Sequence, residues 1–295
     1  MLIKYSKYKK NKIAILYYLS QNVLYIIFYL ISKFLGKNYV SIILYHSVNE
    51  KNSYYSINLK KFFQQMEYLR KNYKIISIDD VIKFINGEIY FSKKCVAITF
   101  DDGYYDNYSI IYPYLMKFNI PATIFITSNY VGKEIKHNNK FIKMLSWNDI
   151  IKMMNIITIG SHTQTHPDLT KINYLMAKAE LKNSKKQIER KINKKIHFIA
   201  YPFNRYNNKV IKLVKKCGYT NAFCGNGLIK KGQNPYEMNR IVIDQSINLI
   251  LFKCQLTMAI ELYIIFKKLI KKILKHFPKI LIFIKNFEIN KKYLI

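Results

Sequence analysis

The feature that most constrains the fold of this chain is an alternation of short apolar runs and longer amphipathic segments between residues 39 and 245. Runs rich in β-branched residues are typical of buried strands, and the longer segments carry apolar residues at helical spacing. Strands that alternate with helices form a parallel sheet, either open or closed into a barrel. The expected strands are 40–45, 74–78, 95–100, 122–127, 156–159, 197–201 and 220–223, and the expected helices include 108–118, 147–154 and 176–192.

The N-terminal end has the pattern of a membrane segment. Residues 13–32 carry no charge, and five lysines precede them. About 20 uncharged residues can span a bilayer as a helix, and a basic leader favours a cytoplasmic N-terminus. Ser20, Gln21 and Asn22 interrupt the run. The alternative is therefore an amphipathic or buried helix that lies on the membrane surface or against the domain.

The C-terminal end predicts a basic amphipathic helix. From Leu262 onward apolar residues recur at helical spacing, and lysines fill the opposite face. Such a helix suits an anionic membrane surface, and its alternative is an ordinary helix packed on the core. We therefore divide the chain into a basic leader with a hydrophobic membrane segment (1–38), an α/β domain (39–245) and a basic helical tail (246–295).

The net charge of the chain is extreme. Its 49 Lys and Arg against 17 Asp and Glu give +32, which favours anionic partners. Lys, Ile, Asn and Tyr are abundant along the whole chain, so the charge reflects a general compositional bias. No compact arginine-rich or aromatic motif typical of nucleic-acid binding accompanies it. We therefore expect no nucleic-acid partner.

Polar residues follow several of the expected strands. His46, Asp101-Asp102, His162 and Tyr201-Pro202 each stand where a strand ends. Ligands of parallel α/β folds bind at the carboxyl ends of the strands, so these residues form a candidate site.

Two histidines and an aspartate in this set suit a metal ion. His162 and His166 are four residues apart, and on a helical turn capped by Ser161 both rings would share one face. Asp102 would add an oxygen ligand, and such a set leaves positions open for water and substrate. An ion would also offset the repulsion between adjacent Asp101 and Asp102. The alternatives are a chance histidine pair and a solvated Asp-Asp-Gly turn.

The two motifs together resemble a known family. Thr99-Phe100-Asp101-Asp102-Gly103 and His162-Thr163-Gln164-Thr165-His166 resemble the first two signature motifs of the polysaccharide deacetylases, the NodB-homology family or carbohydrate esterase family 4. This resemblance implies a distorted (β/α) barrel of about seven strands. It makes Asp101 the general base, and Asp102, His162 and His166 the ligands of a divalent metal ion, with Zn²⁺ the default.

The third motif departs from the family pattern. Ala200-Tyr201-Pro202-Phe203 stands where the family has R-x-P-(Y/F), so the arginine that orients the base is missing. Arg205 and Arg240 are candidates for its place, and Arg240 is also counted among the substrate-binding residues. Tyr201, Pro202, Phe203 and Trp147 are expected to form an apolar wall for the acetyl group and the sugar.

The general acid is expected from the start of the domain. Leu44-Tyr45-His46-Ser47-Val48 resembles the branch that deacetylates poly-N-acetylglucosamine, and in that branch an N-terminal Tyr-His supplies the acid, which makes His46 the candidate. The alternative for His46 is a core or loop histidine.

The resemblance implies a metal-dependent hydrolase that removes N-acetyl groups from an N-acetylglucosamine-containing glycan and releases acetate. It is expected at the bacterial cell membrane, with the extracytoplasmic side favoured for the catalytic domain. The alternatives are a catalytically impaired, membrane-associated glycan-binding module of the same fold and a glycoside hydrolase. A glycoside hydrolase needs two carboxylates ~5–9.5 Å apart across a bond, which adjacent aspartates serve poorly.

Overall fold

The computed structural model describes residues 22–36, 38–49, 56–137 and 140–274, and these belong to two compact units. One unit is Asn38–Ile247, close to the domain expected at 39–245. The other combines Met1–Lys37 with Asn248–Ile295. The two ends of the chain, which the sequence suggested as separate segments, therefore form one unit.

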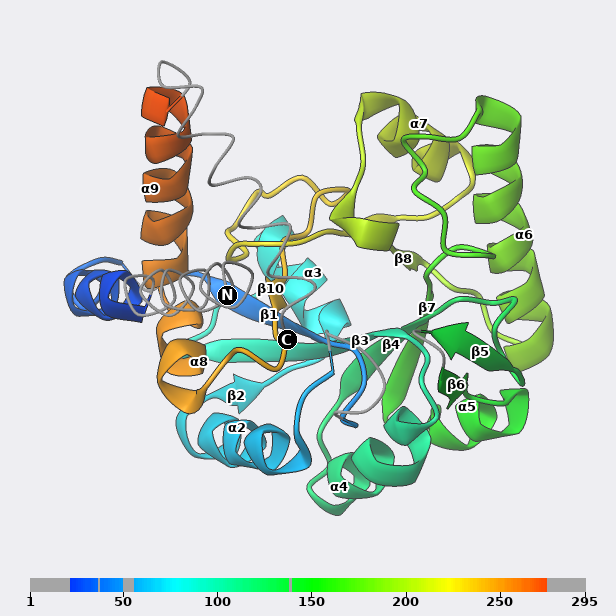
Figure 1. Cartoon of the computed structure of the whole chain (residues 1–295), viewed down its shortest axis with the longest axis horizontal. Coiled ribbons are helices and arrows are strands. Elements are labelled where there is room, and N and C mark those ends of the chain that lie inside the picture. Colours follow the sequence, from blue (N-terminus) through cyan, green and yellow to red (C-terminus); the bar gives the residue numbers. More distant parts are fainter. Residues whose placement is uncertain (1–21, 37, 50–55, 138–139, 275–295) are drawn as a thin grey trace, which may run out of the picture. The chain divides into compact units, whose positions relative to one another are not determined.

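The larger unit is built around a curled parallel sheet with helices outside it (Figure 1). Its main path runs β10-β1-β3-β4-β7-β8-β9, and β2 pairs with β3 beside that path. This confirms the expected parallel α/β class, and the curl is consistent with a distorted barrel. The strands are β1 (Val40–Tyr45), β2 (Lys74–Ile75), β3 (Cys95–Asp102), β4 (Ala122–Ile126), β7 (Ile157–Ser161), β8 (Phe198–Ala200), β9 (Asn221–Phe223) and β10 (Ile241–Val242).

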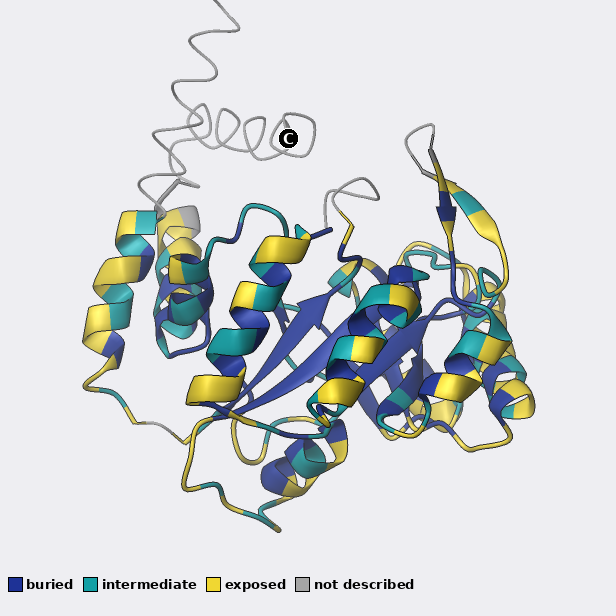
Figure 2. Cartoon of the chain, turned by 90° about the horizontal axis from the view of Figure 1, so that it is seen from below, coloured by how far each residue is buried: buried dark blue, intermediate teal, exposed yellow. Residues whose placement is uncertain are grey.

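The helices between the strands bury one face, and all of them except α4 begin at a polar cap. Asn58 accepts a hydrogen bond from the backbone N–H of Lys60 at 2.7 Å, as expected for a helix N-cap. Figure 2 shows the strands buried, while the helices expose residues on their outer side. The helices are α2 (Leu59–Asn72), α3 (Ile78–Asn86), α4 (Tyr112–Lys117), α5 (Trp147–Met153), α6 (Tyr174–Ile192) and α7 (Asn208–Lys216).

Four local features differ from the sequence prediction. The single helix expected at 108–118 is a π-helix at Asn107–Ile111 followed by α4. The strand expected at 74–78 ends at Ile75, because α3 begins at Ile78. The short strand β10 was not predicted, and neither was the hairpin of β5 (Glu134–His137) and β6 (Lys140–Lys143), whose residues show no strand-like alternation.

The interior of the curled sheet is apolar over most of its depth. Cys95 and Ala97 of β3 pack in one core cluster with Phe125 and Phe223. Side chains alternate along a strand, so the residues two and four positions beyond Ala97 point to the same side. These are Thr99 and Asp101, which bring polar groups to the carboxyl end of the interior.

A short segment bridges the two ends of the sheet path. Met238 pairs with Phe223 of β9, and Ile241 three residues later pairs with Ile43 of β1. Arg240 lies between these two pairings and is fully buried. The segment therefore delivers an arginine to the interior of the sheet.

Candidate active site

The strand register brings the two sequence motifs to the same level. Asp102 at the end of β3 pairs with Ile126 of β4, and Ile126 pairs with Ser161 of β7. The backbone N–H of His162 then donates to the carbonyl of Ile126 at 2.8 Å. Residues about sixty positions apart in the chain are thus held side by side by the ladder of three parallel strands.

Asp102, His162 and His166 converge on one point. The Nε2 atoms of the two histidines are 3.1 Å apart, and Asp102 Oδ1 lies 3.6 Å from His162 Nε2 and 3.5 Å from His166 Nε2. The three potential ligand atoms lie within 4.8 Å of one another. The side chain of His162 is 3% exposed, against 17% for Asp102 and 21% for His166, so the group is open on one side.

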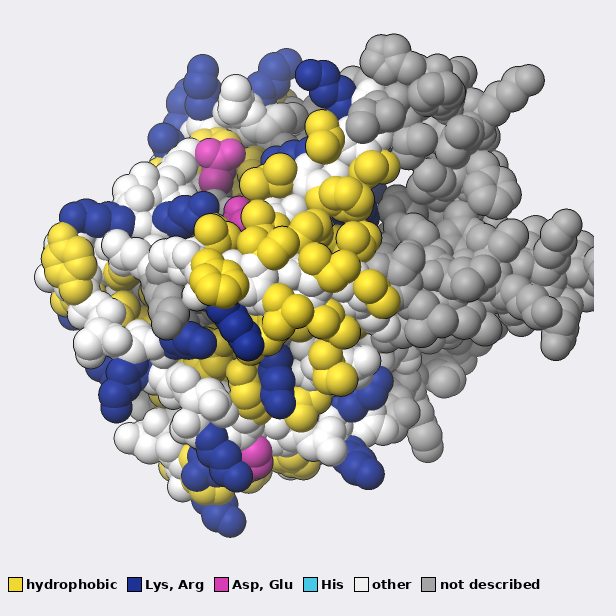
Figure 3. Space-filling model, turned by 90° about the vertical axis from the view of Figure 1, so that its left-hand side faces the viewer, with side chains coloured by type: hydrophobic (Ala, Val, Ile, Leu, Met, Phe, Trp, Pro, Cys, Tyr) yellow, Lys and Arg dark blue, Asp and Glu magenta, His cyan; other side chains and the backbone are white. Residues whose placement is uncertain are grey.

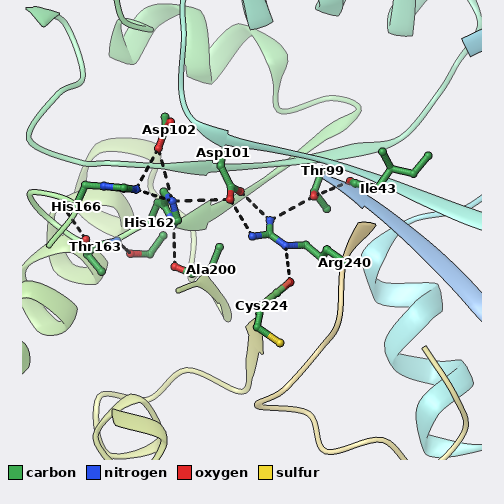
Figure 4. A network of polar contacts seen from close by, with 11 residues as sticks. Ile43, Thr99, Asp101, Asp102, His162, Thr163, His166, Ala200, Cys224 and Arg240 are labelled. Atoms are coloured by element: carbon green, nitrogen blue, oxygen red, sulfur yellow. Dashed lines mark hydrogen bonds and ion pairs between the residues drawn. The ribbon is translucent and has the colours of Figure 1, made fainter. Parts of the chain in front are cut away.

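The tautomer of His162 is set by a backbone carbonyl. Its Nδ1–H donates to the carbonyl of Ala200 at 2.9 Å, which leaves the lone pair of Nε2 facing His166 and Asp102 (Figure 4). Metal-bound histidines usually donate the hydrogen of their other ring nitrogen to a carbonyl or carboxylate in this way. The residues present therefore fit a divalent ion with two imidazole ligands and one carboxylate.

The loop that carries both histidines is not the helical turn that their spacing suggested. Thr163 and His166 have φ of 68° and 62°, in the left-handed region, and Ser161 is the last residue of β7. The Ser161 hydroxyl accepts from the N–H of Thr163, and the Thr163 hydroxyl accepts from the N–H of His166, both at 3.1 Å. Side-chain hydrogen bonds, and not helix geometry, thus bring the two rings together.

Glu180 of α6 holds the same loop from outside. Its carboxylate accepts from the N–H groups of Gln164 and Thr165 at 2.9 and 2.8 Å and from the Thr165 hydroxyl at 2.6 Å. This role could not be predicted from the sequence, because a carboxylate on a long polar helix is normally a solvated surface residue.

Asp101 lies beside the three-residue group and is bound by Arg240. The two ends of the guanidinium donate to the two carboxylate oxygens at 2.7 and 2.8 Å, a bidentate pair (Figure 4). Both side chains are buried. Burial by itself raises the pKa of Asp101, but the charge of Arg240, with a smaller contribution from His162, outweighs it and holds that pKa below its usual value.

The two candidate arginines thus separate clearly. Arg240 makes the contact with Asp101 that the missing motif arginine was expected to make, whereas Arg205 pairs with Asp168 at 2.7 Å and its side chain is 54% exposed. The direct contact with substrate predicted for Arg240 does not fit, because that side chain is fully buried and its guanidinium is bonded to Asp101.

His46 lies directly after the end of β1, the strand next to β3. It follows Tyr45, the last residue of β1, which pairs with Phe100. It is close enough for its charge to help lower the pKa of Asp101. Its loop is tied to the segment after β3: Asn107 Nδ2 donates to the His46 carbonyl at 3.1 Å, and buried Asp106 accepts from the Ser47 hydroxyl. The sequence did not point to Asp106 or Asn107.

The expected apolar wall is present only in part. Tyr201 is fully buried and its hydroxyl donates to the carbonyl of Tyr236, and Pro202 is also buried. These two residues support the site from within and do not line it, which corrects the expectation of substrate contact. Phe203 is 57% exposed, and its ring centroid lies 4.6 Å from that of His166. Trp147 is half-buried at the start of α5.

Low pH is expected to weaken the metal-free protein. Burial, opposed mainly by Asp101, lowers the pKa of His162 to about 4. In the unfolded chain the pKa of this ring is ~6.5. Between pH 6.5 and pH 4 the unfolded state therefore binds more protons than the folded state, and the free energy of unfolding decreases as the pH is lowered. Asp101 acts in the same direction at lower pH, because its folded pKa is depressed. Denaturant titrations of chelator-treated, metal-free protein at pH 7 and pH 5 would measure this decrease in the free energy of unfolding. His162→Gln should reduce it, and the exposed His197→Gln should not.

A parallel α/β sheet with two imidazoles and paired aspartates at its carboxyl edge defines a hydrolase-type site with room for a metal ion. The sequence model of the polysaccharide deacetylases matches residues 89–222. YxkH of Bacillus subtilis (strain 168), whose name assigns it to the polysaccharide deacetylases, is 32% identical over 204 residues, 68% of this chain and 70% of that protein. The chain belongs to the polysaccharide deacetylase family, as its motifs indicated.

Two further similarities agree with this assignment. A poly-β-1,6-N-acetyl-D-glucosamine N-deacetylase of Staphylococcus aureus (strain MRSA252) is 28% identical over 211 residues, 68% of this chain and 72% of that protein. The crystal structure of a polysaccharide deacetylase from Bacillus cereus superposes with a TM-score of 0.63 at 27% identity, covering 74% of this chain and 69% of that one.

Proposed function

We propose that this chain is a metal-dependent N-deacetylase that removes acetyl groups from N-acetylglucosamine units of a polysaccharide or saccharide. The observation that carries the proposal is the convergence of Asp102, His162 and His166 beside a separate, buried Asp101. A site with this division can hold an ion with three side chains and keep a fourth for protons.

The three converging residues are the proposed ligands. Two imidazole nitrogens and one carboxylate oxygen suit Zn²⁺, which is the ion we propose. When bound, such an ion supplies Lewis-acid activation of an amide carbonyl and of water. The partial exposure of Asp102 and His166 leaves one side of the group open to substrate.

Asp101 is the proposed general base. Its depressed pKa keeps the carboxylate ionised at neutral pH, so it can accept the proton of the attacking water. Arg240 fixes both oxygens and so sets the direction in which the carboxylate accepts. The Asp101 carboxylate lies 3.8 Å from His162 Nε2. It is therefore close to the proposed ion site, although it is not one of the three converging residues.

His46 is the proposed general acid. It would give its proton to the departing sugar nitrogen, so that the C–N bond breaks to yield a free amine and acetate. Its position directly after β1, which pairs with β3, places the acid and the base at the ends of neighbouring strands. Phe203 is the exposed aromatic surface beside His166 against which a sugar or acetyl group can pack.

The proposed substrate is a glycan rich in N-acetylglucosamine. This choice rests on the His46 motif and on the similarity to the Staphylococcus aureus deacetylase. The impaired-module alternative rested on the missing motif arginine, and the Arg240–Asp101 pair supports the active enzyme over that alternative. Purified protein incubated with an N-acetylglucosamine oligomer should release acetate. New reducing ends without acetate would instead indicate a glycoside hydrolase.

Replacing His46 separates the acid from the metal site. His46→Ala should lower the rate of acetate release by about 10²- to 10⁴-fold, the usual contribution of a general acid. The metal content should stay that of the wild type, because His46 is not among the three converging residues. Exposed His197→Ala is the control and should keep full activity. Loss of metal in His46→Ala would show that His46 is a ligand and not the acid.

A further inference from the structure

The described parts of the two ends of the chain, residues 22–36 and 248–274, belong to one unit and are largely helical. The helix Asn22–Ser32 packs on α9 (Ala259–Leu274): the rings of Tyr25 and Tyr263 stack with centroids 4.2 Å apart. Phe28 meets Phe266 edge-on at 5.8 Å. The Ser32 hydroxyl donates to that of Thr257, between α8 (Leu249–Gln255) and α9, at 3.2 Å.

The outer face of the helix Asn22–Ser32 is a continuous apolar stripe. Its members share helical spacing and point away from the packed side, where Tyr25 is only 8% exposed. No charged side chain stands within the helix. We call this set the apolar stripe, and it consists of Val23 (55% exposed), Ile26 (41%), Ile27 (45%), Leu30 (52%), Ile31 (46%) and, just beyond the helix, Phe34 (91%).

The outer face of α9 adds positive charge to aliphatic side chains. Ile265 and Leu269 are 61% and 54% exposed. Lys268 and Lys272 are exposed at the positions that share their face, three and seven residues after Ile265. Figure 3 shows hydrophobic side chains gathered on one face of the molecule with Lys or Arg side chains beside them.

We propose that the apolar stripe and the outer face of α9, with Lys268 and Lys272, dock on a lipid bilayer surface that carries anionic headgroups. Exposed apolar patches of this kind mark interaction sites. Lysine is depleted in protein–protein interfaces, whereas lysine interleaved with Ile and Leu is the pattern of helices that lie in an anionic membrane interface. The aliphatic residues insert between acyl chains, and Lys268 and Lys272 meet the headgroups. This proposal is independent of the catalytic one.

Among the residues that the structure describes, none of the helices alone is long and apolar enough to cross a bilayer. One pair, Leu249–Gln255 and Ala259–Ile270, reaches the required length and composition together but is bent by 85°. The part of the expected 13–32 span before residue 22 lies outside the described residues.

Vesicle flotation of the full chain tests the proposal. The wild type should float with phosphatidylcholine vesicles that contain phosphatidylglycerol and bind pure phosphatidylcholine less. Ile27→Glu with Leu30→Glu should weaken binding by about 100-fold or more, because two inserted side chains are lost. The matched control places the same charges on exposed apolar residues of the other unit, Ile151→Glu with Leu175→Glu, and should bind as the wild type.

A second pair of changes tests the charge. Lys268→Glu with Lys272→Glu should lower affinity for the anionic vesicles by at least about 10-fold and remove the preference for them. Acetate release from a soluble oligomer should be unchanged in all these variants. Wild-type binding by Ile27→Glu with Leu30→Glu would overturn the proposal. The proposal would also be overturned if the wild type formed a dimer without lipid and Ile27→Glu with Leu30→Glu were a monomer. That result would mean that a second copy of the chain covers the apolar stripe.

Discussion

Asp101→Asn is expected to lower the rate of acetate release by about 10²- to 10⁴-fold while the protein keeps its metal. The amide cannot accept the proton of the attacking water, but it keeps the shape of the side chain and one oxygen that can accept from Arg240. The three converging residues are untouched, so metal content should equal that of the wild type.

The control for this change is a carboxylate elsewhere on the surface. Asp79→Asn, in the first turn of α3, should leave both the rate and the metal content unchanged. Full turnover by Asp101→Asn would exclude Asp101 as the base. Loss of metal would mean that the carboxylate is a ligand, in contradiction to the division of roles proposed for the two aspartates.

Arg240→Met is expected to cost about 3–5 kcal/mol of folding free energy, because it leaves the Asp101 carboxylate buried without its partner. Burial then dominates, and the pKa of Asp101 rises. The acidic limb of the pH–rate profile should therefore move to higher pH, since a protonated base cannot accept a proton. Arg240→Lys should lie between the wild type and Arg240→Met in both stability and the position of the acidic limb, because it keeps a charge but loses the bidentate contact.

The exposed arginine provides the comparison. Arg205→Met breaks the pair with Asp168. Because the Arg205 side chain is 54% exposed, the loss should lower the free energy of unfolding by no more than about 1 kcal/mol. Thermal or denaturant unfolding measures both variants, and the pH–rate profile adds a readout that a purely structural role would not move. An unshifted acidic limb in Arg240→Met would contradict the proposed control of Asp101 by Arg240.

The sequence predicted the composition of the site better than its geometry. The motifs at Asp101-Asp102 and His162 to His166 could be placed together because each follows a buried apolar run, and parallel strands end at one edge. The spacing of the two histidines suggested a helical turn. The backbone instead uses positive φ at Thr163 and His166, in a loop whose N–H groups donate hydrogen bonds to Ser161 and Glu180 that no local pattern encodes.

Arg240 shows what only the fold could decide. Its position in the chain is far from the third motif, and Arg205 lies much closer to that motif. The choice depends on the segment from Met238 to Val242, which runs from β9 to β1 and turns one side chain inward. Likewise, the burial of Tyr201 follows from its place directly after β8, whereas the sequence showed only an aromatic residue beside a proline.

The composition of the two ends of the chain predicted helices there, but it did not predict how these helices pack on each other. Uncharged residues before 32 and lysines after 262 each indicated a membrane-associated helix. The pairing of Tyr25 with Tyr263 could not be inferred, because helical periodicity shows which face is apolar but not which partner covers it.

The most direct test of the central claim joins metal content to turnover. Acetate release from an N-acetylglucosamine oligomer should disappear when a chelator removes the bound ion and return when Zn²⁺ is added, with one ion per chain. Asp102→Ala, which deletes one of the three converging ligands, should neither retain the ion nor recover activity. Acetate release that persists in protein shown to be free of metal would contradict the account.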